Sequence, residues 1–168
     1  MRRLGLLLVM LVLAIGLPRG PAQAAEGLVE FRLLAPDLAF RLARETLDAC
    51  RERDFQVAVS VVDRFGVQQA MLRDRYAGPH TPDTSRRKAW TAVSFRTDTT
   101  ELVANTRSGT PQAGARDITG ALMLGGGVLV EAGGRMVGAV GVSGAPSGED
   151  DDACARAGIE AIRAELPL

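Results

Sequence analysis

The fold is most constrained by two short apolar segments that a tight turn connects. Residues 57–63 are rich in β-branched side chains, with valine at four of the seven positions, residues 64–66 end in glycine, and residues 67–72 lead back. This pattern is typical of a β-hairpin, whose strands pair antiparallel. A parallel, doubly wound sheet is therefore excluded, because parallel neighbours need long crossover connections.

The remaining pattern predicts an α+β domain. A helix is expected over residues 37–54, preceded by Pro36, and a loop over residues 76–82. Asp83 or Thr84 can cap a second helix that runs through Val93, and Thr99 or Thr100 can cap a short third helix that runs through Val103. The later segments are a loop over 105–117, strands over 118–124, 128–131 and 136–142, and a helix over 149–165. The expected order is α-β-β-α-α-β-β-β-α, with helices packed on one antiparallel five-stranded sheet.

The first 24 residues resemble a secretory signal peptide. Two arginines follow Met1, residues 4–17 are all apolar or glycine, and Ala22-Gln23-Ala24 has the A-x-A form of a cleavage site. An apolar stretch of fourteen residues is shorter than the about 20 that span a bilayer as a helix. We therefore expect residues 1–24 to be removed, leaving a single domain over residues 25–168 that is periplasmic or secreted, without a stable membrane span. An uncleaved anchor is the alternative.

The balance of charged side chains argues against nucleic acid as a partner. The whole chain carries 20 basic and 20 acidic side chains. Removing the leader takes away Arg2, Arg3 and Arg19, so the mature chain has 17 basic against 20 acidic groups. A slightly acidic chain without a basic stripe has no electrostatic surface for a phosphate backbone, and we expect no nucleic-acid binding.

The two cysteines, Cys50 and Cys154, lie 104 positions apart. Each falls on the apolar side of its predicted helix, and an exported protein meets an oxidising compartment that permits disulfides. A disulfide between the two helices and a pair of buried free thiols are both compatible with this pattern. Two cysteines and one distant histidine do not have the spacing of a metal site.

Three catalytic or cofactor motifs are absent. Residues 141–145 approach the G-x-S-x-G nucleophile elbow but end in alanine, and the one histidine precedes the serine. The glycines of residues 138–144 recur every third position, which differs from the dinucleotide-binding G-x-G-x-x-G. No C-x-x-C-H motif for covalent haem attachment occurs.

Four consecutive carboxylates, residues 149–152, begin the last predicted helix. Negative charge at a helix N-terminus complements the helix dipole. A divalent cation is the alternative, but consecutive helical residues point about 100° apart, so few of these carboxylates can share an ion. We therefore interpret the run as a helix start.

Several longer motifs resemble the GlcG/HbpS-like family. They are S-R-R-K-A-W-T-A over residues 85–92, G-G-G-V over 125–128, M-V-G-A-V-G-V-S-G over 136–144, and the hairpin V-A-V-S-V-V-D-R-F-G over 57–66. The resemblance extends from about residue 37 to residue 162. It implies a profilin-like layered fold, homo-oligomers, and binding of haem, with exported relatives acting in haem or redox sensing. A related domain forms the C-terminal half of PduO-type corrinoid adenosyltransferases.

The resemblance also implies a set of ligand-binding residues. The matched positions are Lys88, Gly126, Gly127, Ser143, Gly144 and Asp151. This chain departs from the family pattern at Leu129, where a proline is usual, and at Ala145, where a second glycine is usual.

His80 is the candidate haem ligand because it is the only imidazole in the chain. It lies in the loop before Lys88 and matches no family-wide position, and a lone loop histidine is more often a plain surface residue. Tyr76, Thr84, a methionine or a pocket that holds only the porphyrin are alternatives.

Two functions follow from these observations. The first is a secreted, oligomeric protein that binds haem or a related tetrapyrrole without chemistry of its own. The second is a periplasmic small-molecule enzyme, or an accessory protein of a neighbouring oxidoreductase, in which Lys88 binds an anionic substrate. Binding is favoured, because the sequence contains no base paired with an orienting partner.

Overall fold

The computed structural model of this chain describes residues 27–166, so the expected leader, residues 1–24, lies outside the described residues. The chain divides into two units, Met1–Phe31 and Arg32–Leu168. In the first unit, residues 28–31 form no helix or strand. The second unit contains every helix and strand of the described residues. None of these helices is long and apolar enough to cross a membrane.

The second unit has one antiparallel sheet between two helical layers. Its strands have the order β2-β1-β4-β3. The strands are β1 (Ala58–Asp63), β2 (Gln68–Arg73), β3 (Gly127–Ala132) and β4 (Arg135–Ser143). The helices are α1 (Pro36–Arg51), α2 (Thr81–Phe95), α3 (Thr99–Asn105) and α4 (Gly148–Ala161), with short 3-10 turns at Ala113–Asp117 and Arg163–Glu165. The predicted α+β class, the antiparallel sheet and the hairpin are confirmed.

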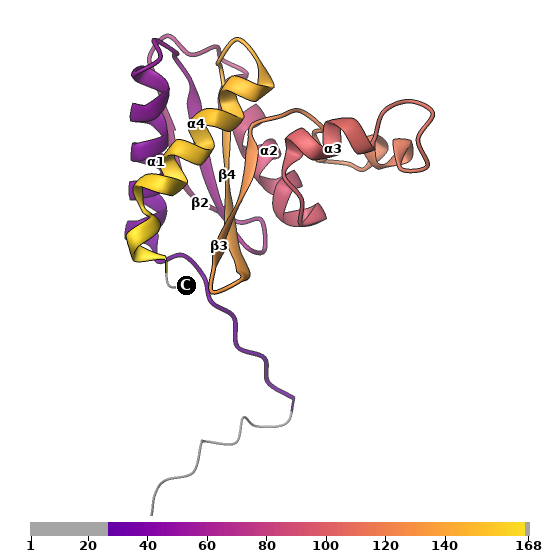
Figure 1. The fold of residues 1–168 in the computed structure, drawn as a ribbon, viewed down its shortest axis with the longest axis horizontal. Helices are drawn as coiled ribbons and strands as arrows, with labels where there is room; N and C mark the ends of the chain where they lie inside the picture. The colour runs from indigo at the N-terminus through magenta and orange to yellow at the C-terminus, as the bar shows by residue number, and fades with distance from the viewer. Residues whose placement is uncertain (1–26, 167–168) are drawn as a thin grey trace, which may run out of the picture. The chain divides into compact units, whose positions relative to one another are not determined.

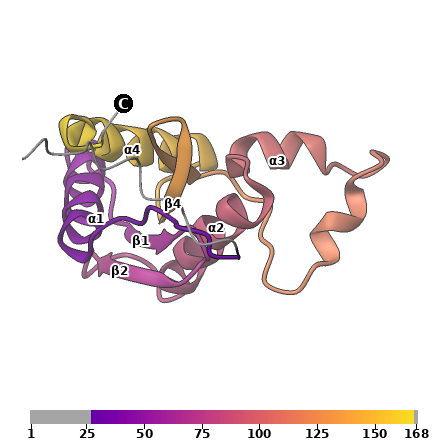
Figure 2. The same ribbon diagram turned by 90° about the horizontal axis from the view of Figure 1, so that it is seen from below.

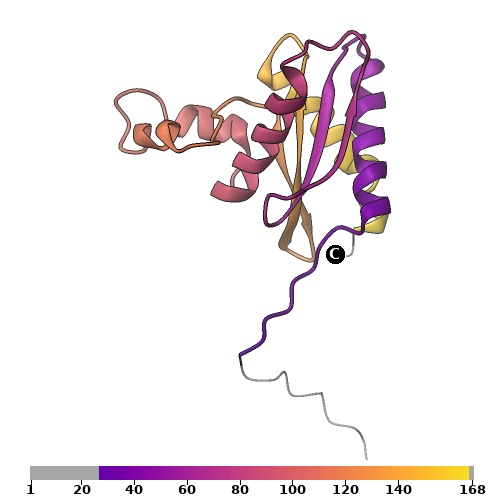
Figure 3. The same cartoon turned by 180° about the vertical axis from the view of Figure 1, so that it is seen from behind.

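Helices α1 and α4 lie side by side on one face of the sheet and α2 covers the other (Figures 1 and 2). The α1/α4 face holds the main core, in which valines of β1, β3 and β4 pack against both helices. A smaller cluster with Val62, Ala89, Ala92, Val93 and Ala139 lies beneath α2. Seen from behind, α3 and the segment after it project from the side of this body (Figure 3).

A glycine allows α2 to lie unusually close to the sheet. Any Cβ built on Gly141 of β4 would overlap the backbone oxygen of Ser85 in α2. Beside this contact the hydroxyl groups of Ser60 and Ser85 share a hydrogen bond of 2.8 Å, so the polar groups trapped between strand and helix are satisfied. The start of α2, which carries several candidate site residues, is thereby held against β1 and β4.

Cys50 and Cys154 form a disulfide bond that joins α1 to α4, with their Cα atoms 5.3 Å apart. Both cysteines are completely buried. Between the two alternatives left by the sequence, the structure therefore has the bridged one, and it leaves no free thiol among the described residues.

The predicted strand over residues 118–124 is wrong, and the sheet has four strands instead of five. Gly120 has a φ of +90° and Ala121 closes a turn back to Ile118, which interrupts an extended segment. The backbone of this segment bonds to α2 instead of a strand, because the Leu122 amide donates to the Thr91 hydroxyl at 2.9 Å. Its apolar side chains still find a core, in a third cluster beneath α3.

Helix boundaries and caps also differ from the prediction. The N-cap residue of α3 is Asp98, so Thr99 and Thr100 lie inside that helix. α1 ends at Arg51, and α4 gives way at Ala161 to the 3-10 turn. α2 begins at Thr81 with Pro82 in its first turn, so neither Asp83 nor Thr84 is its cap. A proline is well accommodated there, because the first turn of a helix does not use its N–H.

Candidate functional site

The residues expected to form a site converge on a pocket where α2 and α4 begin. Its volume is about 550 Å³. The pocket lies between three segments of chain: the start of α2, residues 122–124, and the connection from β4 to α4. The lining includes five of the residues singled out in the sequence, His80, Lys88, Ser143, Gly144 and Asp151.

An ion pair lies at the base of this pocket. The Lys88 ammonium donates to Asp151 Oδ2 at 2.6 Å and to the Val142 carbonyl at 2.9 Å. The other carboxylate oxygen, Asp151 Oδ1, accepts the Ala145 amide at 3.0 Å. The two side chains are only 1% and 5% exposed. Lys88 therefore ties α2 to the end of β4 and to α4, and Asp151 holds the loop that forms one wall.

Burial and mutual attraction act on this pair in opposite directions. Burial lowers the pKa of Lys88, while the charge of Asp151 and the hydrogen bond to it oppose the shift. Burial raises the pKa of Asp151, while Lys88 and the Ala145 amide oppose that shift. Each group therefore depends on the other to remain charged in an environment that disfavours charge.

Gly126 and Gly127 leave room for the pair instead of lining the pocket. A Cβ on Gly126 would lie 2.5 Å from Asp151 Cβ and 3.1 Å from Lys88 Nζ, and its φ is +107°. A Cβ on Gly127 would overlap the Lys88 backbone oxygen. These two glycines hence affect ligand binding only indirectly, by leaving room for Lys88 and Asp151.

Ser143 and Gly144 form the wall between β4 and α4. Gly144 has a φ of +134°, and a Cβ there would lie 2.6 Å from the backbone oxygen of Gln56. Ser147 follows as the N-cap of α4, with its hydroxyl accepting the Asp150 amide at 3.1 Å. The acidic residues that follow occupy the first turn of α4, as expected for a helix start. No group of three or more potential metal ligands occurs within residues 27–166.

His80 lies at the mouth of the pocket, immediately before α2. Its backbone carbonyl accepts the Thr84 hydroxyl at 3.0 Å and the Thr84 amide at 3.1 Å, so the helix start fixes its main chain. The imidazole makes no hydrogen bond to any residue that the structure describes. Thr84 lines the same pocket, whereas Tyr76 lines a different cavity.

Arg87 is a pocket residue that the sequence analysis missed. Its guanidinium donates to the carbonyls of Gly120 at 3.3 Å and Ala121 at 2.9 Å, which leaves Nη1 without a partner among the described residues. The side chain is half-buried and lines the pocket with Leu122 and Leu124. The sequence gives no direct signal for it, because the fold of residues 118–124 determines where Arg87 points.

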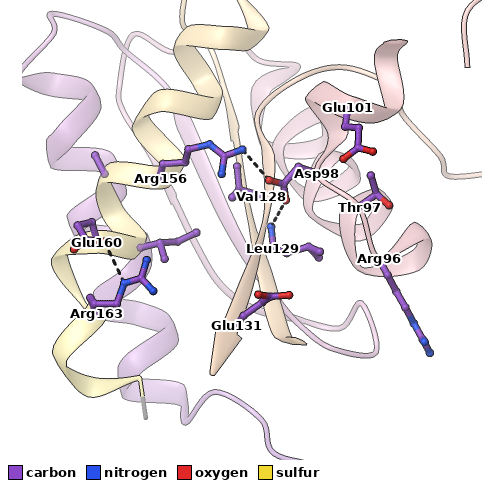
Figure 4. A pocket seen from close by; sticks show the side chains of 12 residues that line it. Arg96, Thr97, Asp98, Glu101, Val128, Leu129, Glu131, Arg156, Glu160 and Arg163 are labelled. Carbon is purple, nitrogen blue, oxygen red and sulfur yellow. Dashed lines mark hydrogen bonds and ion pairs between the residues drawn. The ribbon is translucent and has the colours of Figure 1, made fainter. Parts of the chain in front are cut away.

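A larger cavity, of about 730 Å³, lies at the open edge of β3 but contains none of the expected site residues. Two ion pairs, Arg156 with Asp98 and Arg163 with Glu160, lie among its charged side chains (Figure 4). Asp98 accepts the Leu129 amide at 2.9 Å and the Arg156 guanidinium at 2.8 Å. A proline at position 129, usual in the family pattern, has no amide hydrogen for this bond. We regard the smaller pocket as the candidate site because the predicted residues converge there.

Fold and site together define a class: a layered α+β domain with one antiparallel sheet and a pocket at two helix N-termini, supported by a buried lysine–aspartate pair. A family model described as "Haem degrading protein HbpS-like" matches residues 34–160. The chain belongs to this HbpS-like family, as the motifs of the sequence indicated.

Solved structures agree with this assignment. A double mutant of Streptomyces reticuli HbpS is 39% identical, with a TM-score of 0.76 over 85% of this chain and 97% of that chain. Klebsiella pneumoniae protein ORFY is 26% identical, with a TM-score of 0.79 over 84% of this chain and 99% of that chain. A PduOC:haem complex is 29% identical, with a TM-score of 0.73 over 77% and 95% of the two chains. A search of curated protein sequences found no significant match.

Proposed function

We propose that this protein binds haem, or a closely related tetrapyrrole, in the pocket between the starts of α2 and α4. The observation that carries the proposal is the position of His80, the only imidazole of the chain, in the same pocket as the Arg87 guanidinium. Family membership supports it, since one relative's structure is a haem complex and the family's description names haem.

The chemistry of the lining suits the three parts of haem. The iron requires a donor such as an imidazole nitrogen, which His80 supplies. The flat apolar ring requires apolar contacts, and Leu122, Leu124 and Pro146 line the pocket. A propionate requires a cation or a strong donor, and Arg87 retains an unused Nη1. The volume falls within the range of about 300 to 1,000 Å³ that is usual for small-molecule sites.

Lys88 has a supporting role in this proposal. Its ammonium is 1% exposed and bonded to Asp151 and Val142, so a bound anion meets Arg87 before it meets Lys88. The alternative function, an enzyme in which Lys88 binds an anionic substrate, requires this buried pair to open first. Binding of haem does not, and it is therefore the function that the geometry supports best.

A haemin titration of the mature protein tests the proposal. The expected result is a Soret band that saturates at a fixed haem-to-chain ratio. In His80→Ala the spectral signature of histidine ligation is expected to disappear and to return when free imidazole is added. An unchanged spectrum in His80→Ala contradicts the ligand assignment, and the absence of saturable binding in the parent contradicts the function.

The same proposal includes export and assembly. Residues 1–24 direct the chain out of the cytoplasm, and the mature chains form a homo-oligomer that reports haem or redox state outside the cell or in the periplasm. The leader-like sequence and the family resemblance support these statements. N-terminal sequencing of protein from the periplasm or medium is expected to begin at Ala25, and an intact leader there contradicts the export step.

A further inference from the structure

A separate cavity of about 510 Å³ lies where the end of α1 meets the end of β2. None of its residues lines the candidate haem pocket. Its lining consists of Arg51, Gln56, Arg73, Asp74, Arg75 and Tyr76. Three guanidinium groups thus surround a single carboxylate, a composition that attracts anions.

The carboxylate of Asp74 is only half satisfied. Arg51 donates to Asp74 Oδ1 twice, from Nε at 2.9 Å and from Nη2 at 2.6 Å. Arginine and carboxylate groups often pair through both oxygens, but here both donors converge on one. Asp74 Oδ2 is buried and has no hydrogen-bond partner among the described residues. A buried acceptor without a donor is unfavourable, so this atom favours a ligand that brings a hydrogen atom.

The backbone holds Asp74 in place. Its amide donates to the Val57 carbonyl at 2.9 Å, and its own carbonyl accepts the Ala77 amide at 3.1 Å. The residue as a whole is only 4% exposed. The main chain of Asp74 is hence held in place beside the cavity.

The three arginines differ in how they are bound. Arg51 is held by Asp74 and, at 2.8 Å, by Asp48. Arg73 donates to the Ala77 carbonyl. Arg75 is exposed and makes no hydrogen bond or ion pair within residues 27–166. Positive charge that the protein itself leaves uncompensated is therefore concentrated on Arg73 and Arg75.

We infer that this cavity binds a hydrogen-bearing oxyanion, of which hydrogen phosphate is the simplest. Its P–OH group donates to Asp74 Oδ2, while its other oxygens accept hydrogen bonds from Arg73 and Arg75. An oxyanion without a proton, such as sulfate, instead brings a lone pair against the carboxylate and is repelled. Asp74 thus selects between two anions of the same shape, because one of them lacks the donor that a buried acceptor requires.

Access to Asp74 Oδ2 requires a movement of neighbouring side chains, since the atom is shielded from water in this structure. Arg73 and Arg75 are both exposed and have long, flexible side chains. Turning them toward an anion that enters the cavity places their guanidinium groups around it.

Calorimetric titration with inorganic phosphate, at pH 7 in a buffer free of other oxyanions, tests the inference. The mature protein is expected to bind phosphate saturably and sulfate about tenfold more weakly or worse at equal ionic strength, since one charged hydrogen bond is lost. Equal binding of the two anions, or no saturable phosphate binding, overturns the inference.

Two variants locate the site. Arg75→Gln removes an exposed charge without disturbing any bond of the fold, and it should weaken phosphate binding about tenfold with unchanged thermal unfolding. Arg44→Gln, an exposed α1 arginine outside the cavity, is the matched control and should bind as the parent does. Asp74→Asn should bind sulfate as well as phosphate. Phosphate binding that survives Arg75→Gln unchanged, or an Asp74→Asn protein that still excludes sulfate, contradicts the assignment.

Discussion

Lys88 is the only lysine of the chain, and every other side chain with a permanent positive charge is an arginine. The position of Lys88 in the fold explains why this residue is a lysine and not an arginine. The compact ammonium fits between Asp151, the Val142 carbonyl and Gly126, where a Cβ would already lie 3.1 Å from Nζ. A guanidinium is larger and planar, and it does not fit the same space. The ion pair of Lys88 and Asp151 therefore supports the pocket wall.

Removing one partner of this pair is expected to be much worse than removing both charges. Lys88→Met leaves the Asp151 carboxylate buried without a counter-ion, and breaking a buried pair in this way costs about 3 to 5 kcal/mol. In Lys88→Met/Asp151→Asn no charge remains, and the amide oxygen of the new asparagine can still accept the Ala145 N–H. Urea unfolding should therefore show the double variant to be more stable than Lys88→Met alone. A double variant that loses the sum of the two single effects contradicts the coupling of the two charges.

The pair also predicts a pH dependence with a definite sign. In Asp151→Asn the negative charge that opposes the effect of burial is lost and only the hydrogen bond to the Val142 carbonyl remains, so the pKa of Lys88 in the folded state falls further below its ordinary value than in the parent. Between the folded and the unfolded pKa, the unfolded chain binds more protons, and stability rises with pH. The deficit of Asp151→Asn relative to the parent is thus expected to shrink from pH 7 to pH 9.5, by at most about 1.4 kcal/mol per pH unit.

Urea unfolding of both proteins at several pH values in this range measures the effect. The disulfide-linked parent serves as the reference at each pH. A deficit that stays constant or grows toward pH 9.5 would show that Lys88 keeps its proton in the variant, and that Asp151 is not what keeps it charged.

The sequence predicts the identity of these residues better than their roles. Motif resemblance indicated Lys88 and Asp151, but they are 63 positions apart and their ion pair emerges only from the fold. Arg87 adjoins Lys88 and lines the same pocket, but its orientation depends on hydrogen bonds to the carbonyls of Gly120 and Ala121, 33 and 34 positions away. The sequence alone does not indicate which face of α2 lines a cavity.

Among the secondary-structure elements, the sequence predicts those that depend on contacts between residues close together in the chain. The hairpin of β1 and β2 depends on a β-branched run and a glycine turn, and it was predicted nearly to the residue. The segment 118–124 has a similar apolar composition but no free strand edge of the sheet accepts it. Its conformation depends on Thr91 and Arg87, about 30 residues earlier in the chain. Because these contacts join residues about 30 positions apart, no local sequence pattern indicates them.

The disulfide gives a prediction at the same scale. Because Cys50 and Cys154 close a loop of 104 residues between α1 and α4, their bond should stabilise the fold by about 4 to 5 kcal/mol in the chain-entropy model. Urea unfolding with and without a reductant measures this difference. Thiol titration of protein recovered from its exported location should detect no free thiol after denaturation without reductant. Two reactive thiols under those conditions would contradict the bridged state in the mature protein.

For the whole molecule, we first predict that mature chains assemble into a homo-oligomer. The proposed homo-oligomer should give a light-scattering mass several times that of one mature chain, independent of column calibration. The measurement is best made with and without haemin, which shows whether the mass depends on the ligand. A clean monomer at micromolar concentration contradicts the assembly part of the proposal without affecting the pocket.

The central claim is that the pocket between α2 and α4 holds haem, and two adjacent arginines allow the most direct test. Arg87 lines the pocket, whereas Arg86 lies outside it and pairs with Asp83 at 2.8 Å. Both are changed to glutamine, and retention of the fold is checked by thermal unfolding before haemin is titrated.

Arg86→Gln is expected to bind haemin like the parent. Arg87→Gln should bind about tenfold more weakly, because a charged hydrogen bond to a propionate is lost. Its Soret maximum should remain unchanged, because the iron ligand is a different residue. Equal haemin affinity in the parent, Arg86→Gln and Arg87→Gln would contradict the claim that haem lies in this pocket.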